Sequence, residues 1–279
     1  MEKTFHFLSG LPRSGNTLLS AILNQNPSIY STPLSPISSL MWSCVDSCFN
    51  LDTIGRNENN AARAETLVSS FLREFYKDVE KPVVIDRDKN WGTPDNLKII
   101  KQFVTPKPKI IFTVRDILEI IASFVRMDDQ HFKAAALVNN NFINNYRSEQ
   151  DIIAEHLMAP NDHIDKALLS LSSAFLKEND GIFHIVEYND LVSQPEKTMD
   201  GIYAFLEMPE YQHNFEKIEK VEKDDDEAVG LPKNLHEIRK SLSKSSTSTD
   251  ILSDYIKHKY SNMEFWRDGS LMKVKGKDF

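Results

Sequence analysis

The chain has 279 residues, of which 41% are hydrophobic and 27% are charged. This length and apolar content allow one substantial core, so we expect a single domain over residues 1–279. The formal net charge of −8 argues against a nucleic-acid-binding protein, because phosphate contacts would require a basic face.

The beginning of the chain has the pattern of a strand, a glycine loop and a helix. Apolar residues over positions 5–8 predict a buried strand that opens into a turn at Gly10. Leucine and isoleucine then recur at helical spacing from about Gly15 to Asn24, which predicts a helix with one apolar face. Glycines let the backbone close around an anion, and the unpaired N–H groups of a helix N-terminus point toward it. We therefore interpret residues 10–17 as a phosphate-binding loop, called the phosphate loop below.

The phosphate loop departs at one position from the loop of ATP- and GTP-binding enzymes, G-x-x-x-x-G-K-[ST]. Gly10, Gly15 and Thr17 fit that spacing, but Asn16 stands where a kinase has the lysine that holds the β- and γ-phosphates. The loop instead carries its cation earlier, at Arg13. The candidate phosphate-binding residues are Pro12, Arg13, Ser14, Gly15, Asn16 and Thr17.

The sequence LPRSGNTLL, residues 11–19, resembles the 5′-phosphosulfate loop of sulfotransferases, which use 3′-phosphoadenosine 5′-phosphosulfate (PAPS). It looks closest to the bacterial and tyrosylprotein-type members, in which Pro-Arg-Ser-Gly replaces Pro-Lys-Ser-Gly. The resemblance implies a three-layer α/β sandwich with a central parallel sheet, similar to the P-loop nucleotide hydrolases, with helical cap segments. It also implies PAPS as cosubstrate and adenosine 3′,5′-bisphosphate (PAP) as product.

The next part of the chain predicts one loop and two helices. Residues 30–36 contain two prolines and predict an irregular loop. Residues 37–49 predict a helix that is either part of the core or one wall of a substrate pocket, and residues 61–76 predict an amphipathic helix. Cys44 and Cys48 are the only cysteines and lack nearby histidines, so we expect free buried thiols rather than zinc ligands.

A short apolar run over residues 83–85 predicts a parallel strand that ends in charged residues. Ligands of open α/β sheets bind at the carboxyl ends of the strands, so these charges are expected at a cleft. The resemblance to sulfotransferases implies that Asp86 or Asp88 is the general base. It also implies that Arg87 or Lys89 neutralises the charge of the sulfate. A base must lie within hydrogen-bond reach of the acceptor hydroxyl, and the choice between the two aspartates stays open.

The run IIFTV, residues 110–114, is typical of a buried parallel strand. Arg115 ends this run, and Ser123 follows in the predicted helix about two turns later. This arrangement resembles the 3′-phosphate site of sulfotransferases. The chemistry suits a phosphate, because a guanidinium group pairs with it bidentately and a hydroxyl donates one more hydrogen bond.

Residues 128–160 are rich in asparagine and carry His131, which is the next candidate base after the two aspartates. We interpret this segment either as a lid over the acceptor site or as ordinary surface helices. Further on, residues 182–188 predict another buried strand. The segment from Tyr188 to Pro195 resembles the Tyr-Glu-Asp-Leu-x-x-x-Pro segment of sulfotransferases, in which the tyrosine lies near the adenine.

Residues 222–249 contain the only dense cluster of cations and hydroxyl groups, with Arg239, Lys244 and Ser245 as candidate cofactor-binding residues. That composition suits a loop that covers the 3′-phosphate and ribose, and a solvated linker is the alternative. Residues 255–266 then predict a closing helix and its packing.

These motifs predict sulfuryl transfer from PAPS to a hydroxyl or amine. A carboxylate would take a proton from the acceptor, which attacks sulfur in line, while Arg13 and the loop amides stabilise charge on the leaving phosphate. No metal is expected, because amides and cations supply that stabilisation. Two alternatives are an ATP-dependent small-molecule kinase of the same fold and a nucleotide-binding protein without catalysis.

The ends and the hydropathy of the chain bear on location. The N-terminus has no signal-peptide pattern, and no window approaches the ~20 apolar residues of a membrane span. We therefore expect a cytoplasmic protein that acts on a small-molecule or soluble acceptor, without nucleic-acid or membrane partners. No sequence feature specifies an oligomeric state.

Overall fold

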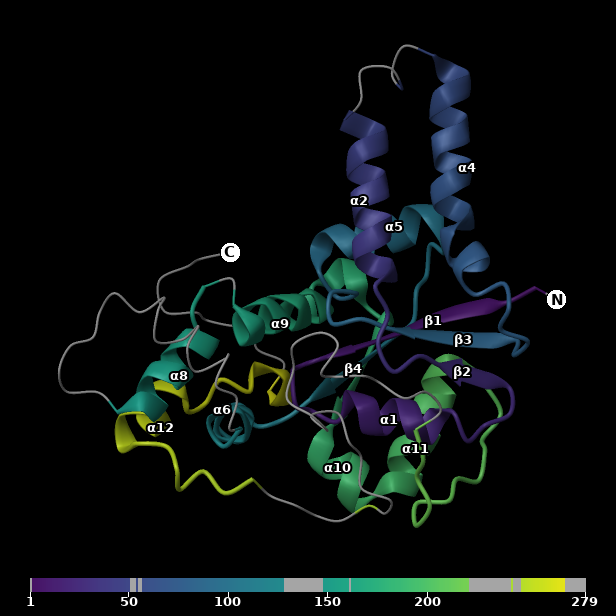
Figure 1. Cartoon of the computed structure of the whole chain (residues 1–279). Helices are drawn as coiled ribbons and strands as arrows, with labels where there is room; N and C mark the ends of the chain where they lie inside the picture. Colours follow the sequence, from purple (N-terminus) through teal and green to yellow (C-terminus); the bar gives the residue numbers. More distant parts are fainter. Residues whose placement is uncertain are drawn as a thin grey trace.

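The computed structural model of the protein describes residues 2–50, 54, 57–127, 148–160, 162–220, 242 and 247–268. Its centre is a five-stranded sheet with the order β2-β3-β1-β4-β5, and every pairing in it is parallel. Helices cover both faces of the sheet (Figure 1). This arrangement confirms the expected α/β fold with a central parallel sheet.

The strands are short, and most of their residues are buried. They are β1 (Thr4–Gly10), β2 (Ile29–Ser31), β3 (Val83–Arg87), β4 (Ile110–Val114) and β5 (Phe183–Glu187). All five residues of β4 are buried, as expected for a central parallel strand. The register pairs Leu8 with Arg87 and Gly10 with Thr113, so the carboxyl ends of β1, β3 and β4 lie at one edge.

The helices account for most of the remaining described chain. They are α1 (Asn16–Leu23), α2 (Ile37–Asn50), α4 (Glu58–Phe75), α5 (Pro94–Phe103), α6 (Ile117–Val125), α8 (Glu149–Leu157), α9 (His163–Ser172), α10 (Tyr188–Ser193), α11 (Pro195–Leu206) and α12 (Asp254–Tyr260). The described residues also form the short 3-10 helices η1 (Ser173–Phe175), η2 (Lys177–Asn179) and η4 (Phe265–Arg267).

Alternating residues of β1 separate two of the hydrophobic clusters. Phe7 belongs to a cluster with α2, α4 and α5, whereas Leu8 belongs to a cluster with α1 and α11. Successive side chains of a strand point to opposite faces, so these two clusters lie on opposite faces of the sheet. Each joins the sheet to the helices that cover that face. A third cluster joins β4 to α6, α8, α9 and α12.

Two elements differ from the sequence prediction. Tyr30 and Ser31, expected as part of an irregular loop, belong to the edge strand β2, which pairs with β3. Helix α5 was not predicted, although it begins at Pro94, a residue that favours the first turn of a helix. Edge strands of three residues carry too little alternation to be recognised in a sequence.

The predicted helix at residues 37–49 has a mixed environment. Ile37 and Met41 are completely buried, while Trp42 is 46% exposed. The base of α2 is therefore part of the core, and its outer part projects from the sheet beside α4 (Figure 1). Cys44 and Cys48 are half-buried free thiols whose Sγ atoms lie 3.9 Å apart.

The predicted lid over residues 128–160 is described only from residue 148 onward. Its described part contains helix α8, whose Ile153 and Leu157 are buried in the third cluster. The Glu155 carboxylate accepts hydrogen bonds from Tyr255, Lys259 and Tyr260, which fasten α8 to α12. This part is therefore packed into the fold, and residues 128–147, including His131, lie outside the described residues.

Among the described helices, none is both long and apolar enough to cross a membrane.

Candidate active site

The phosphate loop joins β1 to α1 and is packed too tightly for side chains at its glycines. A Cβ atom on Gly10 would overlap the hydroxyl oxygen of Thr113. Gly15 has a φ of 90°, and a Cβ atom there would lie 2.8 Å from Cδ2 of Tyr188. Only glycine adopts this left-handed conformation without strain. The backbone of the loop therefore lies directly against β4 and the first residue of α10.

Two polar residues of the loop point inward and hold its shape. The Ser14 hydroxyl is completely buried, 2.6 Å from the Leu11 carbonyl oxygen and 2.6 Å from Oγ1 of Thr113. The Asn16 amide donates from Nδ2 to the same Leu11 carbonyl at 3.0 Å. Asn16, which stands where a kinase has its lysine, thus stabilises the loop through a hydrogen bond between two of its own residues.

Arg13 has an unusual backbone and a side chain that crosses to α6. Its φ is 59°, in the left-handed region that non-glycine residues rarely adopt. Its Nε donates a hydrogen bond to Oγ of Ser123 at 3.2 Å. Burial lowers the pKa of the guanidinium, and the nearby positive charge of Arg115 lowers it further. A bound anion would favour the charged form of the guanidinium and so oppose both effects.

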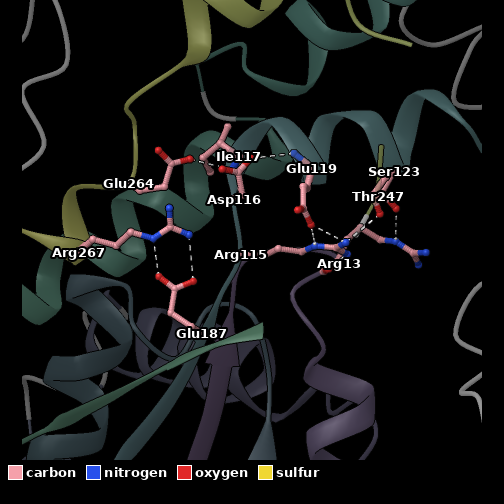
Figure 2. Close-up of polar contacts among 10 residues, drawn as sticks. All are labelled: Arg13, Arg115, Asp116, Ile117, Glu119, Ser123, Glu187, Thr247, Glu264 and Arg267. Atoms are coloured by element: carbon pink, nitrogen blue, oxygen red, sulfur yellow. Dashed lines mark hydrogen bonds and ion pairs between the residues drawn. The ribbon is translucent and has the colours of Figure 1, made fainter. Parts of the chain in front are cut away.

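Arg115 follows β4 and lies beside Arg13, as Figure 2 shows. It is 6% exposed. Its Nη1 donates to the carbonyl oxygen of Arg13 at 3.1 Å, and its Nη2 donates to Oγ1 of Thr247 at 2.8 Å. Its Nε donates to Glu119 at 2.9 Å, and the guanidinium carbon lies 4.4 Å from the centre of the Tyr188 ring. The structure therefore brings the predicted pair Arg115 and Ser123 together, with both in contact with Arg13.

The C-terminal part of the described chain closes around this site. The Glu264 carboxylate accepts a hydrogen bond from the backbone N–H of Ile117 at 3.1 Å, which satisfies a donor in the first turn of α6. Arg267 pairs with Glu187 at 2.8 Å, immediately before Tyr188 (Figure 2). These contacts fix residues 247–268 against the strand ends β4 and β5.

The two candidate bases differ in their surroundings. Asp86 is completely buried, with one oxygen bonded to the Tyr76 hydroxyl and the other to Nε1 of Trp91 at 2.6 Å. Burial raises its pKa to about 6. Asp88 lies beyond the end of β3 and is 5% exposed, with Oδ1 accepting from the backbone N–H of Asn90 at 2.8 Å. Burial raises the pKa of Asp88 as well.

The cations beside the aspartates also differ. Nη1 of Arg87 donates to Oγ1 of Thr17 at 3.1 Å and to the carbonyl of Pro33. Arg87 thus brings a further cation to the phosphate loop, besides Arg13 and Arg115. The side chain of Lys89 is exposed, and its main-chain carbonyl oxygen accepts from Ser9 at 2.9 Å. Lys89 therefore contributes its backbone to the end of β1, whereas Arg87 contributes its side chain to the loop.

The remaining predicted cofactor-binding residues are Tyr188 and three residues of the segment 222–249. Tyr188 is half-buried between Gly15 and Arg115. Arg239, Lys244 and Ser245 lie outside the described residues. Thr247 was not predicted, although it belongs to the hydroxyl-rich run 245–249. No group of three or more potential metal-ligating side chains occurs within the described part of the chain.

Comparisons with known proteins give a family and similar folds. The model of the sulfotransferase family matches residues 7–213. The structure is similar to the sulfotransferase domain from the curacin biosynthetic pathway, at 17% identity and a TM-score of 0.52, over 80% of this chain and 79% of that one. It is also similar to the sulfotransferase domain of the Synechococcus PCC 7002 olefin synthase, at 16% identity and a TM-score of 0.51, over 90% of this chain and 89% of that one.

At these identities the two structures establish similarity of fold. Comparison with curated protein sequences gives no match. The match of the family model covers more than half of the 279 residues and includes the phosphate loop, Arg115, Ser123 and Tyr188. The chain belongs to the sulfotransferase family.

Proposed function

We propose that this protein transfers a sulfuryl group from PAPS to a hydroxyl or amine of a small-molecule acceptor. The observation that carries the proposal is the meeting of Arg13, Arg115 and Ser123, which come from two different strand-to-helix connections. Arg115 is buried, Arg13 is half-buried, and the positive charge of each disfavours that of the other, so the pair favours a bound anion and matches a phosphate group. The Pro-Arg-Ser-Gly sequence supports membership of the bacterial and tyrosylprotein-type subgroup.

The residues of the site fit an anionic nucleotide. The backbone N–H groups at the start of α1 and the Arg13 side chain would hold the 5′-phosphosulfate. Arg115 and Ser123 would hold the 3′-phosphate, and Tyr188, whose ring lies against Arg115, would lie near the adenine. When bound, PAPS supplies an activated sulfuryl group.

We propose Asp88 rather than Asp86 as the general base. Both oxygens of Asp86 are engaged by Tyr76 and Trp91, and the carboxyl group has no exposed surface. Asp88 lies past the end of β3 at the same edge as the phosphate loop, where ligands of parallel sheets bind. Its raised pKa makes it a stronger base than an ordinary carboxylate.

The cations of the chain have complementary roles in the proposed reaction. Arg13 stabilises the negative charge that develops on the leaving phosphate, because its guanidinium is held near the loop before the reaction begins. Arg87 stabilises the end of the loop at the first turn of α1, through its hydrogen bond to Thr17. A kinase would need a cation at position 16 to hold the phosphates. The side-chain amide of Asn16 instead donates to the Leu11 carbonyl oxygen within the loop.

Calorimetric titration with PAP, beside ATP with magnesium in the same buffer, tests the proposal first. Tight binding of PAP that weakens in Arg115→Ala supports the proposed donor, and binding of ATP alone contradicts it. Release of PAP from PAPS in the presence of a panel of phenols, alcohols and amines then tests transfer itself. A protein that binds PAP but transfers sulfate to no acceptor would be a nucleotide-binding protein without catalysis.

A further inference from the structure

The two cysteines of the chain lie on one face of helix α2. Cys44 and Cys48 are one helical turn apart, a spacing that places their side chains next to each other. Their Sγ atoms are 3.9 Å apart, within hydrogen-bond distance for sulfur. Both are free thiols and both are half-buried. The helix therefore holds two sulfur ligands side by side.

The two thiols differ in their packing. Cys44 packs against the hydrophobic cluster that contains Met41, a completely buried residue one turn earlier on the same stripe of α2. Cys48 belongs to none of the hydrophobic clusters formed by the described residues. It lies on the outer part of α2, which projects from the sheet beside α4 (Figure 1). A cysteine that serves only as a small apolar residue is expected inside a cluster, so packing does not account for Cys48.

The distance between the two sulfurs matches that of two thiolates on one metal ion. Thiolates that each lie about 2.3 Å from an ion stand about 3.8 Å apart at a tetrahedral ion and about 4.0 Å apart at a trigonal one. The observed separation of 3.9 Å lies between these values. An ion could therefore be held by both sulfurs without movement of the helix backbone.

A disulfide bond between the same residues would require such movement. Bridged cysteines have Cβ atoms about 3.8 Å apart, whereas residues at this helical spacing keep their Cβ atoms about 5–6 Å apart. A bond between Cys44 and Cys48 would thus distort α2. The helix geometry favours a shared metal ion over an internal disulfide.

The ligand set indicates which metal ion the pair would take. Structural zinc is almost always held by four ligands. Within the part of the chain that the structure describes, no group of three or more His, Cys, Asp or Glu side chains could hold a metal ion. Cu(I) accepts two thiolates as its ligands, and soft sulfur ligands select it over harder ions. Two thiols on a stripe that also carries the Met41 thioether are soft ligands of this kind.

We propose that Cys44 and Cys48 form a binding site for one Cu(I) ion, in which both sulfurs coordinate the ion as thiolates. Binding replaces the two S–H hydrogens by one Cu(I) and releases two protons to the solvent, so the bound group carries one negative charge. No electron is transferred in this step. The site goes beyond the proposed sulfate transfer and does not rest on it.

The test is an anaerobic titration of the reduced full chain with Cu(I), in competition with the chromophoric chelator bicinchoninate. The wild type should bind one equivalent. Cys44→Ser and Cys48→Ser should each lower the affinity about 100-fold or more, since loss of a group that only orients a metal ligand already costs about 10- to 100-fold. Wild-type affinity in either variant would overturn the proposal. Thermal unfolding checks that both variants are folded.

A variant with the same number of thiols is the matched control. Ser43→Cys combined with Cys44→Ser moves one thiol to an exposed position, and side chains at positions 43 and 48 do not face each other on a helix. This double variant should bind Cu(I) as weakly as Cys44→Ser alone. Wild-type affinity would show that two cysteines anywhere on α2 suffice, and would contradict a site built by their spacing.

Two further measurements identify the ligands and the metal. Burial raises the pKa of the Cys44 thiol, and its hydrogen bond with Cys48 raises it further, so the affinity for Cu(I) should increase with pH as the metal displaces fewer protons. An affinity that does not change with pH would exclude thiolate coordination. Zn²⁺ should bind more weakly than Cu(I) in the same buffer, and equal or tighter binding of Zn²⁺ would overturn the choice of Cu(I).

Discussion

Nη1 of Arg115 donates a hydrogen bond to the main-chain carbonyl oxygen of Arg13 at 3.1 Å. This contact joins the end of β4 to the phosphate loop, where Arg13 has a φ of 59°. A left-handed non-glycine residue costs about 1–3 kcal/mol and persists only when its surroundings stabilise it. Arg115 thus stabilises the backbone that presents the Arg13 side chain, besides bringing its own charge to the site.

Replacement of Arg115 should therefore impair two functions of the loop at once. We expect Arg115→Ala to weaken PAP binding about 100-fold or more, because a charge-assisted phosphate contact and the support of Arg13 are both lost. Calorimetric titration measures this effect. Arg126→Ala is the matched control, since Arg126 is an exposed arginine at the end of the same helix α6. Equal affinities of the two variants would remove Arg115 from the site.

Replacement of Arg13 should slow turnover while the fold stays intact. The charge that it presents near the leaving phosphate predicts a loss of about 10²- to 10³-fold in kcat for Arg13→Ala. Arg13→Gly is an informative second variant, because glycine adopts a φ of 59° without strain and so preserves the loop backbone. If the glycine variant turned over like the wild type, the guanidinium would have no catalytic role. Circular dichroism and thermal unfolding verify the fold.

Gly15 provides a test of how tightly the loop is packed. Its φ of 90° opposes any side chain, and a Cβ atom at this position would lie only 2.8 Å from the Tyr188 ring. Gly181 has a φ of 77°, but a Cβ atom there would have nothing within 4 Å, so Gly181 isolates the backbone effect. We expect Gly181→Ala to cost about 1 kcal/mol in the free energy of unfolding and Gly15→Ala to cost more and to abolish PAP binding. Urea unfolding and calorimetry measure the two effects. Equal losses in the free energy of unfolding for the two variants would show that the Tyr188 ring moves to accommodate the added methyl group.

Local patterns in the sequence predicted the parts of the fold that are continuous in the chain. The bounds of β4 follow from its nearly continuous run of β-branched and aromatic residues, and the phosphate loop follows from the spacing of Gly10 and Gly15. Arg115 and Ser123 were paired because an arginine that ends a strand and a serine in the next helix resemble the 3′-phosphate site of sulfotransferases. In each case the signal lies within a window of one or two elements.

The remaining features depend on contacts between distant segments. No local pattern shows that Thr247 meets Arg115, or that residues 247–268 pack against α6 and β5. The environment of Asp86 is also set by partners that follow α4 and β3, so the sequence could not separate it from Asp88. The roles of both aspartates stay predictions.

Asparagine substitutions separate the two aspartates as catalysts. Asp88→Asn should lower turnover about 10²- to 10⁴-fold, because an amide cannot accept the proton of the acceptor. Asp86→Asn keeps a side chain of the same shape and should retain turnover, since its oxygens face Tyr76 and Trp91. Steady-state kinetics with saturating PAPS measures both variants. The opposite result would assign the base to Asp86, and full activity of both would direct attention to His131.

Asp86 should instead determine how stability depends on pH. Its pKa is raised from 3.8 to about 6 by burial, so between these values the native state holds a proton that the unfolded state has released. The free energy of unfolding should therefore fall as the pH rises from about 4 to about 6, by about 3 kcal/mol for this one group, and then stay level. Asp86→Asn lacks the titrating group and should lose this part of the pH dependence.

The measurement is urea unfolding at intervals between pH 4 and pH 7 for the wild type, Asp86→Asn and Asp88→Asn. Burial also raises the pKa of Asp88, so Asp88→Asn shows how much of the slope belongs to that neighbour. Asp86→Asn will differ from the wild type by a constant amount as well, because an asparagine oxygen cannot accept from Tyr76 and Trp91 as two carboxylate oxygens do. The decisive quantity is thus the change of this difference with pH. If the curves of the wild type and Asp86→Asn ran parallel from pH 4 to pH 6, the hydrogen bonds from Tyr76 and Trp91 would fully offset the cost of burying the charge.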